Sequence, residues 1–266
     1  MTQQDKSHPN PETEKVYSAL NEKADSIEPE DLTEHDVDYR AEGGPRLTYL
    51  YDSDGGLHGQ SLYLGGEIGC DGKIYFIPGH ALRVLVLDPQ TDKVYQVGPV
   101  FPGKFKWLRG IVVGEVIYGL PCNDDTVLRI HVPTLEITTI KIPYHEFYNT
   151  ENGYSPEICK QQQESLWKYH GGGISPKDGC IYVIPQMALH VLKIDPKTEK
   201  CEFVGPALEG RYKYYGGIIS KIDNALYGVP HNASNVLRID PPHITTHGNL
   251  NADGHKWHGG AASDDG

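Results

Sequence analysis

A six-residue motif that returns along the chain constrains its fold more than any other feature of the sequence. The clearest copy is Trp167-Lys168-Tyr169-His170-Gly171-Gly172. The five copies begin at Ser61, Phe105, Trp167, Tyr212 and His255. These starting residues are 44, 62, 45 and 43 positions apart. Three of the spacings match the length that four strands and their turns require, and the spacing of 62 includes an insert before Leu166.

The signals inside each repeat follow the order expected of a four-stranded antiparallel meander. A glycine pair opens the first strand, where missing side chains let neighbouring backbones approach closely. A turn such as Asp178-Gly179 precedes a strand that carries Tyr182 and ends at Pro185, because proline cannot donate to the ladder. The alternating run Val191–Ile194 predicts a third strand, and Asp195-Pro196 predicts the turn into a fourth.

We expect two regions. Residues 1–44 hold −8 of the net charge of −12 and contain too few apolar residues to form a core, so they are predicted to be disordered or to form short helices. This acidic leader is either a solubilising arm or a segment that docks on a partner. The repeats are predicted to fill residues 45–266, with frames near 61–104, 105–166, 167–211 and 212–254 and a partial frame at 255–266.

The repeat resembles a β-propeller blade and is most similar to the broad group of kelch, NHL and YncE-like propellers, over about residues 45–266. This resemblance implies an all-β fold of about five four-stranded antiparallel blades. A further strand at Thr48–Tyr51 would close the ring by pairing with residues 255–263. The alternative is that the sequence is a fragment of a longer propeller. The resemblance does not fix a function, because propellers carry many unrelated activities.

Charge and composition exclude several classes of partner. The net charge of −12 argues against nucleic acid, whose binding needs clustered Lys and Arg. The sequence has no run of about 18 apolar residues, so no membrane insertion is expected. The first thirty residues lack the apolar stretch of a signal peptide, which favours a cytoplasmic location, with the nucleus as the alternative. The five cysteines show no CxxC spacing and are expected to be reduced.

One face of the blades should gather the residues with functional potential. The start of each first strand and the turn between strands two and three are expected on the same face, around the mouth of the channel. The insert at residues 144–165, expected to be an elaborated loop, should lie over this face too. The candidate ligand-binding residues are His80, Asn123, His170, Gln186, Tyr215, His231, Asn232 and His258.

The repeated lysines of the motif have two interpretations. Because a residue that recurs in every blade usually serves packing between blades, their stems are expected to lie along aromatic rings of neighbouring blades. The other interpretation is a polar, aromatic-lined mouth for a ligand. The lysines concerned are Lys106, Lys168, Lys213 and Lys256.

The predicted function is a non-enzymatic, kelch-like binding or scaffold protein for a protein partner or a small polar ligand. It needs no cofactor, and we assign no catalytic residue. The alternative is a metal-dependent hydrolase or lyase of the lactonase or lyase propeller type, with one divalent ion such as Ca²⁺ or Mg²⁺. Candidate ligands for that ion are His80, Asn123, Asp124, His170, His231 and His258.

Overall fold

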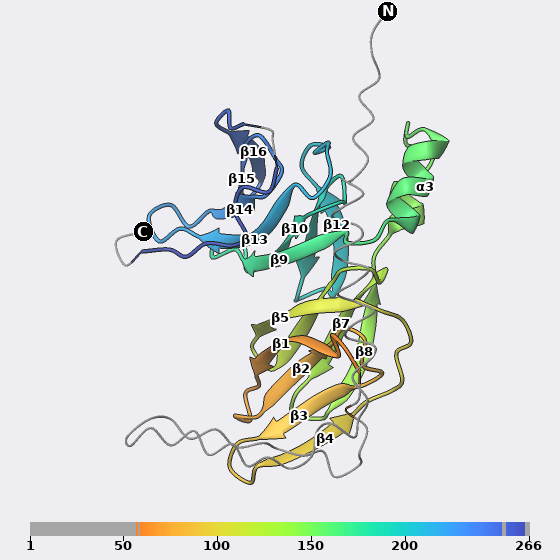
Figure 1. Cartoon of the computed structure of the whole chain (residues 1–266), viewed down its shortest axis with the longest axis vertical. Helices are drawn as coiled ribbons and strands as arrows, with labels where there is room; N and C mark the ends of the chain where they lie inside the picture. Colours follow the sequence, from red (N-terminus) through yellow and green to blue (C-terminus); the bar gives the residue numbers. More distant parts are fainter. Residues whose placement is uncertain (1–56, 58, 252–253, 264–266) are drawn as a thin grey trace, which may run out of the picture. The chain divides into compact units, whose positions relative to one another are not determined.

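The computed structural model describes residues 57, 59–251 and 254–263. The leader at 1–44 and the strand expected at 48–51 lie outside these residues. The described chain is all-β apart from two short helices, and its strands form four antiparallel sheets of four strands each, the blades of a β-propeller fold (Figure 1). The fold class predicted from the repeat is therefore confirmed.

Within every blade, strands that follow one another in sequence are hydrogen-bonded neighbours, as in a meander. Blade 1 contains β1 (Tyr63–Ile68), β2 (Ile74–Pro78), β3 (Val84–Asp88) and β4 (Lys93–Val97). Blade 2 contains β5 (Trp107–Val113), β6 (Val116–Pro121), β7 (Thr126–His131) and β8 (Glu136–Lys141). Blade 3 contains β9 (Tyr169–Ile174), β10 (Ile181–Pro185), β11 (Val191–Asp195) and β12 (Lys200–Val204). Blade 4 contains β13 (Tyr214–Ile219), β14 (Leu226–Pro230), β15 (Val236–Asp240) and β16 (His243–His247).

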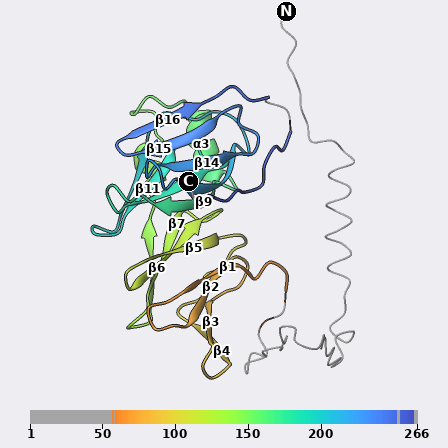
Figure 2. The ribbon, with the colours of Figure 1, turned by 90° about the vertical axis from the view of Figure 1, so that its left-hand side faces the viewer.

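The first strands β1, β5, β9 and β13 adjoin one another in chain order and form the inner edge of the blades (Figures 1 and 2). One main-chain hydrogen bond recurs at each junction: the N–H of the motif lysine donates to a carbonyl in the turn between strands two and three of the preceding blade. These bonds are Lys106 to Gly79 (3.2 Å), Lys168 to Cys122 (2.9 Å), Lys213 to Gln186 (3.0 Å) and Lys256 to His231 (2.9 Å). The two recurring motifs therefore share one face, as predicted.

The apolar core lies between blades. Alternate side chains of each strand point toward the neighbouring blade, so three buried clusters form, one at each junction of successive blades. At the third junction, Ile184 and Val191 of blade 3 pack with Tyr214 and Leu237 of blade 4. Burial of this surface holds successive blades together, because apolar area removed from water is the main favourable term in folding.

The glycine pairs permit close approach of inner strands, as predicted. Gly171 has φ +77°, and a Cβ placed on it would lie 2.9 Å from the Cα of Gly216 in the next blade. A side chain here would be both strained and overlapped by backbone. The backbone of blade 4 can therefore approach β9 this closely because residue 171 has no side chain.

The insert between blades 2 and 3 is not the loop that the sequence predicted. It forms α2 (Tyr144–Phe147) and α3 (Pro156–Glu164), and α3 begins with Ser155 capping the N–H of Ile158. The ring of Tyr144 packs 5.1 Å from that of Phe203 on β12. Since these contacts draw the insert onto blade 3, it contributes none of the residues that line the cavity described below.

The opposite face carries the Asp-Gly type turns, and their aspartates do more than permit the turn. Each accepts a hydrogen bond from the tyrosine four residues later, on strand two of the same blade. The pairs are Tyr75 to Asp71 (3.0 Å), Tyr182 to Asp178 (2.7 Å) and Tyr227 to Asp223 (2.8 Å).

Neither of the two described helices is long and apolar enough to cross a membrane.

Candidate functional site

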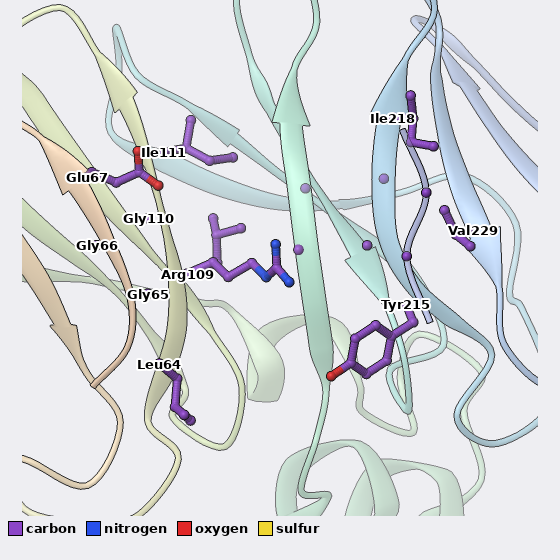
Figure 3. A pocket seen from close by; sticks show the side chains of 17 residues that line it. Leu64, Gly65, Gly66, Glu67, Arg109, Gly110, Ile111, Tyr215, Ile218 and Val229 are labelled. Carbon is purple, nitrogen blue, oxygen red and sulfur yellow. The ribbon is translucent and has the colours of Figure 1, made fainter. Parts of the chain in front are cut away.

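A cavity of about 460 Å³ lies between the inner strands β1, β5, β9 and β13 and the C-terminal residues Gly259 and Gly260 (Figure 3). Nine of its 17 lining residues are glycines, because the glycine pair of each motif copy lies at this point of the strand. Ile111, Ile218 and Val229 add apolar surface. The motif thus creates a space whose walls are largely main chain.

Arg109 is the cationic side chain among the described lining residues. It occupies the fifth motif position, which is glycine in the four other copies. Figure 3 shows its guanidinium extending from β5 toward β9. Glu67 on β1 lines the cavity too, and burial raises the pKa of its carboxyl while the charge of Arg109 partly opposes this. The cavity therefore contains one group of each charge.

Three stacked rings cross the inner strands beside the cavity. The ring of Tyr215 lies 3.5 Å from that of His170, at an angle of 26°, and 3.6 Å from that of His258, at 29°. All three occupy the fourth motif position. Burial, then the charge of Arg109, lowers the pKa of His170 to about 4, so this imidazole is neutral near pH 7. The stack fixes the direction of the Tyr215 side chain.

A pair of histidines adjoins the stack. Nδ1 of His255 lies 2.6 Å from Nε2 of His231, whose ring is 5.6 Å from those of both Tyr215 and His258. At this separation one imidazole donates to a free lone pair of the other, so the two cannot both be fully protonated. Burial, followed by the charge of His255, lowers the pKa of His231.

The structure brings together four of the eight predicted site residues, His170, Tyr215, His231 and His258, but only Tyr215 lines the cavity. That the four bind a ligand stays a prediction. Sequence reasoning missed Arg109, Glu67 and His255. The signal for Arg109 was available, since it breaks the glycine rule of its motif position.

The other four candidates lie, like His231, in the turns between strands two and three of their blades. Asn123 joins blades, because its Oδ1 accepts the N–H of Trp167 at 2.8 Å. The ring of His80 packs edge-on against Phe105 at 4.2 Å. Gln186 is buried, and its Oε1 and the Oδ1 of Asn232 have no hydrogen-bond partner among the described residues.

Among the four motif lysines, Lys106 and Lys213 join blades through hydrogen bonds of their ammonium groups, a contact that the sequence did not predict, whereas Nζ of Lys256 has no hydrogen-bond partner among the described residues. Nζ of Lys213 donates to the carbonyls of Gln186 (3.1 Å), Ala188 (2.8 Å) and Gly210 (3.4 Å). Lys106 is held by three carbonyls in the same way. Burial lowers the pKa of Lys213 to about 7, whereas three acceptors around one nitrogen favour the ammonium form. We take the amine to be charged at neutral pH, because only the ammonium group donates to all three.

The residues considered for a divalent ion are not gathered into one donor set. In the described part of the chain, no three or more His, Cys, Asp or Glu side chains are arranged to hold a metal ion. The carboxylate of Asp124 instead accepts the N–H (3.0 Å) and the hydroxyl (2.6 Å) of Thr126 within its own turn.

The sequence matches no protein-family model and no curated protein. Two solved lyase structures are similar in fold. A catalytically inactive virginiamycin B lyase from Staphylococcus aureus with quinupristin superimposes with a TM-score of 0.51 at 15% identity, over 70% of this chain and 55% of the lyase. A streptogramin B lyase gives a TM-score of 0.51 at 15% identity, over 71% and 55%. The likeness shows the propeller fold, and this chain spans about half the length of these proteins.

Proposed function

We propose that the protein binds a small polar ligand in the cavity between its inner strands and does not transform it. The observation that carries this proposal is the glycine-lined cavity itself, into which Arg109 and Tyr215 extend (Figure 3). Its volume of 460 Å³ lies within the range of about 300–1,000 Å³ found for small-molecule sites, which combine apolar walls with a few placed polar groups.

The lining favours binding over metal-assisted catalysis. Among the described lining residues the ionisable side chains are Glu67, Arg109 and Tyr215. Hard divalent ions take several oxygen ligands, and one carboxylate beside a guanidinium does not provide them. The size of the cavity also favours a small ligand over a protein partner, because stable protein interfaces require a much broader contact surface.

A substitution that fills the cavity with a large side chain tests the proposal. Backbone amide NMR spectra of the protein would be recorded with mixtures of sugars, organic acids and amino acids, and the variant Val229→Trp would be compared with Val100→Trp. Val229 lines the cavity, whereas Val100 is exposed outside it. We expect a compound that shifts the amides of Gly172 and Gly217 in the wild type and in Val100→Trp but not in Val229→Trp.

Two results would contradict the proposal. The first is a ligand whose binding is the same in Val229→Trp as in the wild type. The second is a compound that the wild-type protein converts to a product and Val229→Trp does not, which would place catalysis in this cavity.

A further inference from the structure

We propose, on the basis of the proposed function, that the ligand carries an oxyanion, a carboxylate or a phosphate, and that Arg109 and Tyr215 bind this group together. Arg109 extends from β5 and Tyr215 from β13, and β9 lies between them. The proposal concerns the chemical class of the ligand, which neither the fold nor the cavity volume specifies.

Arg109 is an exception in the repeat. Three of the four glycines at the same motif position, Gly171, Gly216 and Gly259, have φ of +77°, +80° and +118°, a conformation that favours glycine, whereas Gly65 does not. Blade 2 departs from this pattern and places a long cationic side chain at the same position, in the cavity. Since glycine occupies this position in the other four copies, the repeat itself does not require an arginine there.

The guanidinium of Arg109 is exposed and unpaired among the described residues. It has five N–H donors in a fixed planar fork, and it forms no hydrogen bond or ion pair within the described residues. Glu67 lines the same cavity without forming an ion pair with it. A guanidinium fork matches the two oxygens of a carboxylate or a phosphate, and such paired bonds are among the strongest in proteins.

The hydrogen-bond donors of Arg109 and Tyr215 converge on β9. Figure 3 shows the Tyr215 hydroxyl and the Arg109 guanidinium both directed toward β9, from opposite sides. The ring of Tyr215 is held between His170 and His258, so its hydroxyl is already oriented before a ligand arrives. Preorganisation of this kind reduces the entropy lost on binding. Gly171 and Gly172 on β9 leave room for the oxyanion between the two donors.

The position of Glu67 indicates which other polar group the ligand carries. Its carboxyl lies on β1, on the far side of Arg109 from Tyr215 (Figure 3). A carboxylate accepts hydrogen bonds from hydroxyl and ammonium groups. The cavity therefore suits a small acid that also carries a hydroxyl or an amine.

The test is an NMR titration of the full chain with sodium phosphate and, separately, sodium acetate, at constant ionic strength made up with sodium chloride. We expect saturable shifts at Gly172 and Gly217 with at least one of the two probes, and the tighter probe distinguishes a phosphate from a carboxylate. Arg109→Gln should weaken this binding by about tenfold or more, as loss of a paired charge-assisted bond predicts. Tyr215→Phe should weaken it by about three- to tenfold.

The matched control is Arg211→Gln, which removes an exposed arginine that does not line the cavity and should leave binding unchanged. Arg109→Lys keeps the charge without the fork and should bind at an intermediate level, which separates anion binding from a folding defect. Unchanged binding in Arg109→Gln, or shifts that chloride reproduces, would overturn the inference. A neutral compound that binds Arg109→Gln as tightly as wild type but is lost in Val229→Trp would leave the proposed function standing without the anion site.

Discussion

The main-chain N–H of Lys256 donates to the carbonyl of His231 at 2.9 Å. This bond repeats the one that joins each earlier pair of blades, so the C-terminal residues continue the propeller beyond blade 4. They do so although residues 254–263 form no strand. The relationship matters for the site, because it places Gly259 and Gly260 against the cavity and His258 against Tyr215.

Removing the ammonium group of Lys213 should weaken the junction of blades 3 and 4. Lys213→Met leaves the carbonyls of Gln186 and Ala188 without their donor, and we expect a loss of about 3 kcal/mol in the free energy of unfolding. Urea denaturation measures this. Lys160→Met, at an exposed position of α3, is the control and should change stability by less than about 0.5 kcal/mol. Equal stability of the two variants would contradict the role given to Lys213.

The buried imidazole of His170 predicts a loss of stability in acid. Its pKa is about 4 in the folded protein, against 6.5 for an ordinary histidine. Between these values the unfolded chain binds a proton that the folded protein does not, so stability is complete above pH 6.5 and falls by about 3 kcal/mol as the pH decreases toward 4. His170→Phe keeps a ring against Tyr215 and should lack this part of the loss. Parallel curves of unfolding free energy against pH for wild type and variant would contradict the assignment.

Because the inner strands approach closely, a glycine-to-alanine substitution should destabilise the protein by different amounts in blades 3 and 4. Gly171 and Gly216 have φ of +77° and +80°, but only at Gly171 would a Cβ meet backbone, 2.9 Å away. Both alanine variants bear the conformational cost, and Gly171→Ala adds an overlap that should bring about 1–3 kcal/mol of further destabilisation. Thermal and urea unfolding measure the difference, and a Gly216→Ala variant less stable than Gly171→Ala would contradict this packing.

The tyrosine-to-aspartate bond should contribute measurably to blade 3. Tyr182→Phe removes the donor to the Asp178 carboxylate, and we expect a loss of about 1–2 kcal/mol. Tyr118 occupies the same place in blade 2, where the residue four positions earlier is Gly114 and not an aspartate, and its hydroxyl makes no such bond. Tyr118→Phe is therefore the matched control, and a larger loss there than in Tyr182→Phe would contradict the account.

The sequence repeat predicted the blades well because the same contacts within and between blades recur along the chain, and they require the same residue types each time. The second glycine of the motif and strand-ending prolines such as Pro185 recur in every blade, and the motif lysine recurs in all blades but the first. The repeat did not predict the helices of the insert, because the insert has no counterpart in the other blades, although Ser155-Pro156 is a common start of a helix.

The site was harder to predict for two reasons. It includes a residue that departs from the repeated motif, and it depends on residues that are distant in sequence and close in space. Arg109 differs from the consensus, so a search for recurring residues passes over it. The pairing of His231 with His255 joins residues 24 positions apart through the junction of two blades, which only the geometry reveals. Asn123 was a reasonable candidate by type and face, yet its side chain is used to hold Trp167.

The most direct test of the central claim is the measurement of intermolecular NOEs between a bound ligand and the methyl groups of the protein. The account predicts NOEs to both Ile111 and Ile218, which line the cavity from different blades. NOEs confined to residues outside the cavity, such as the highly exposed Ile222, would contradict it.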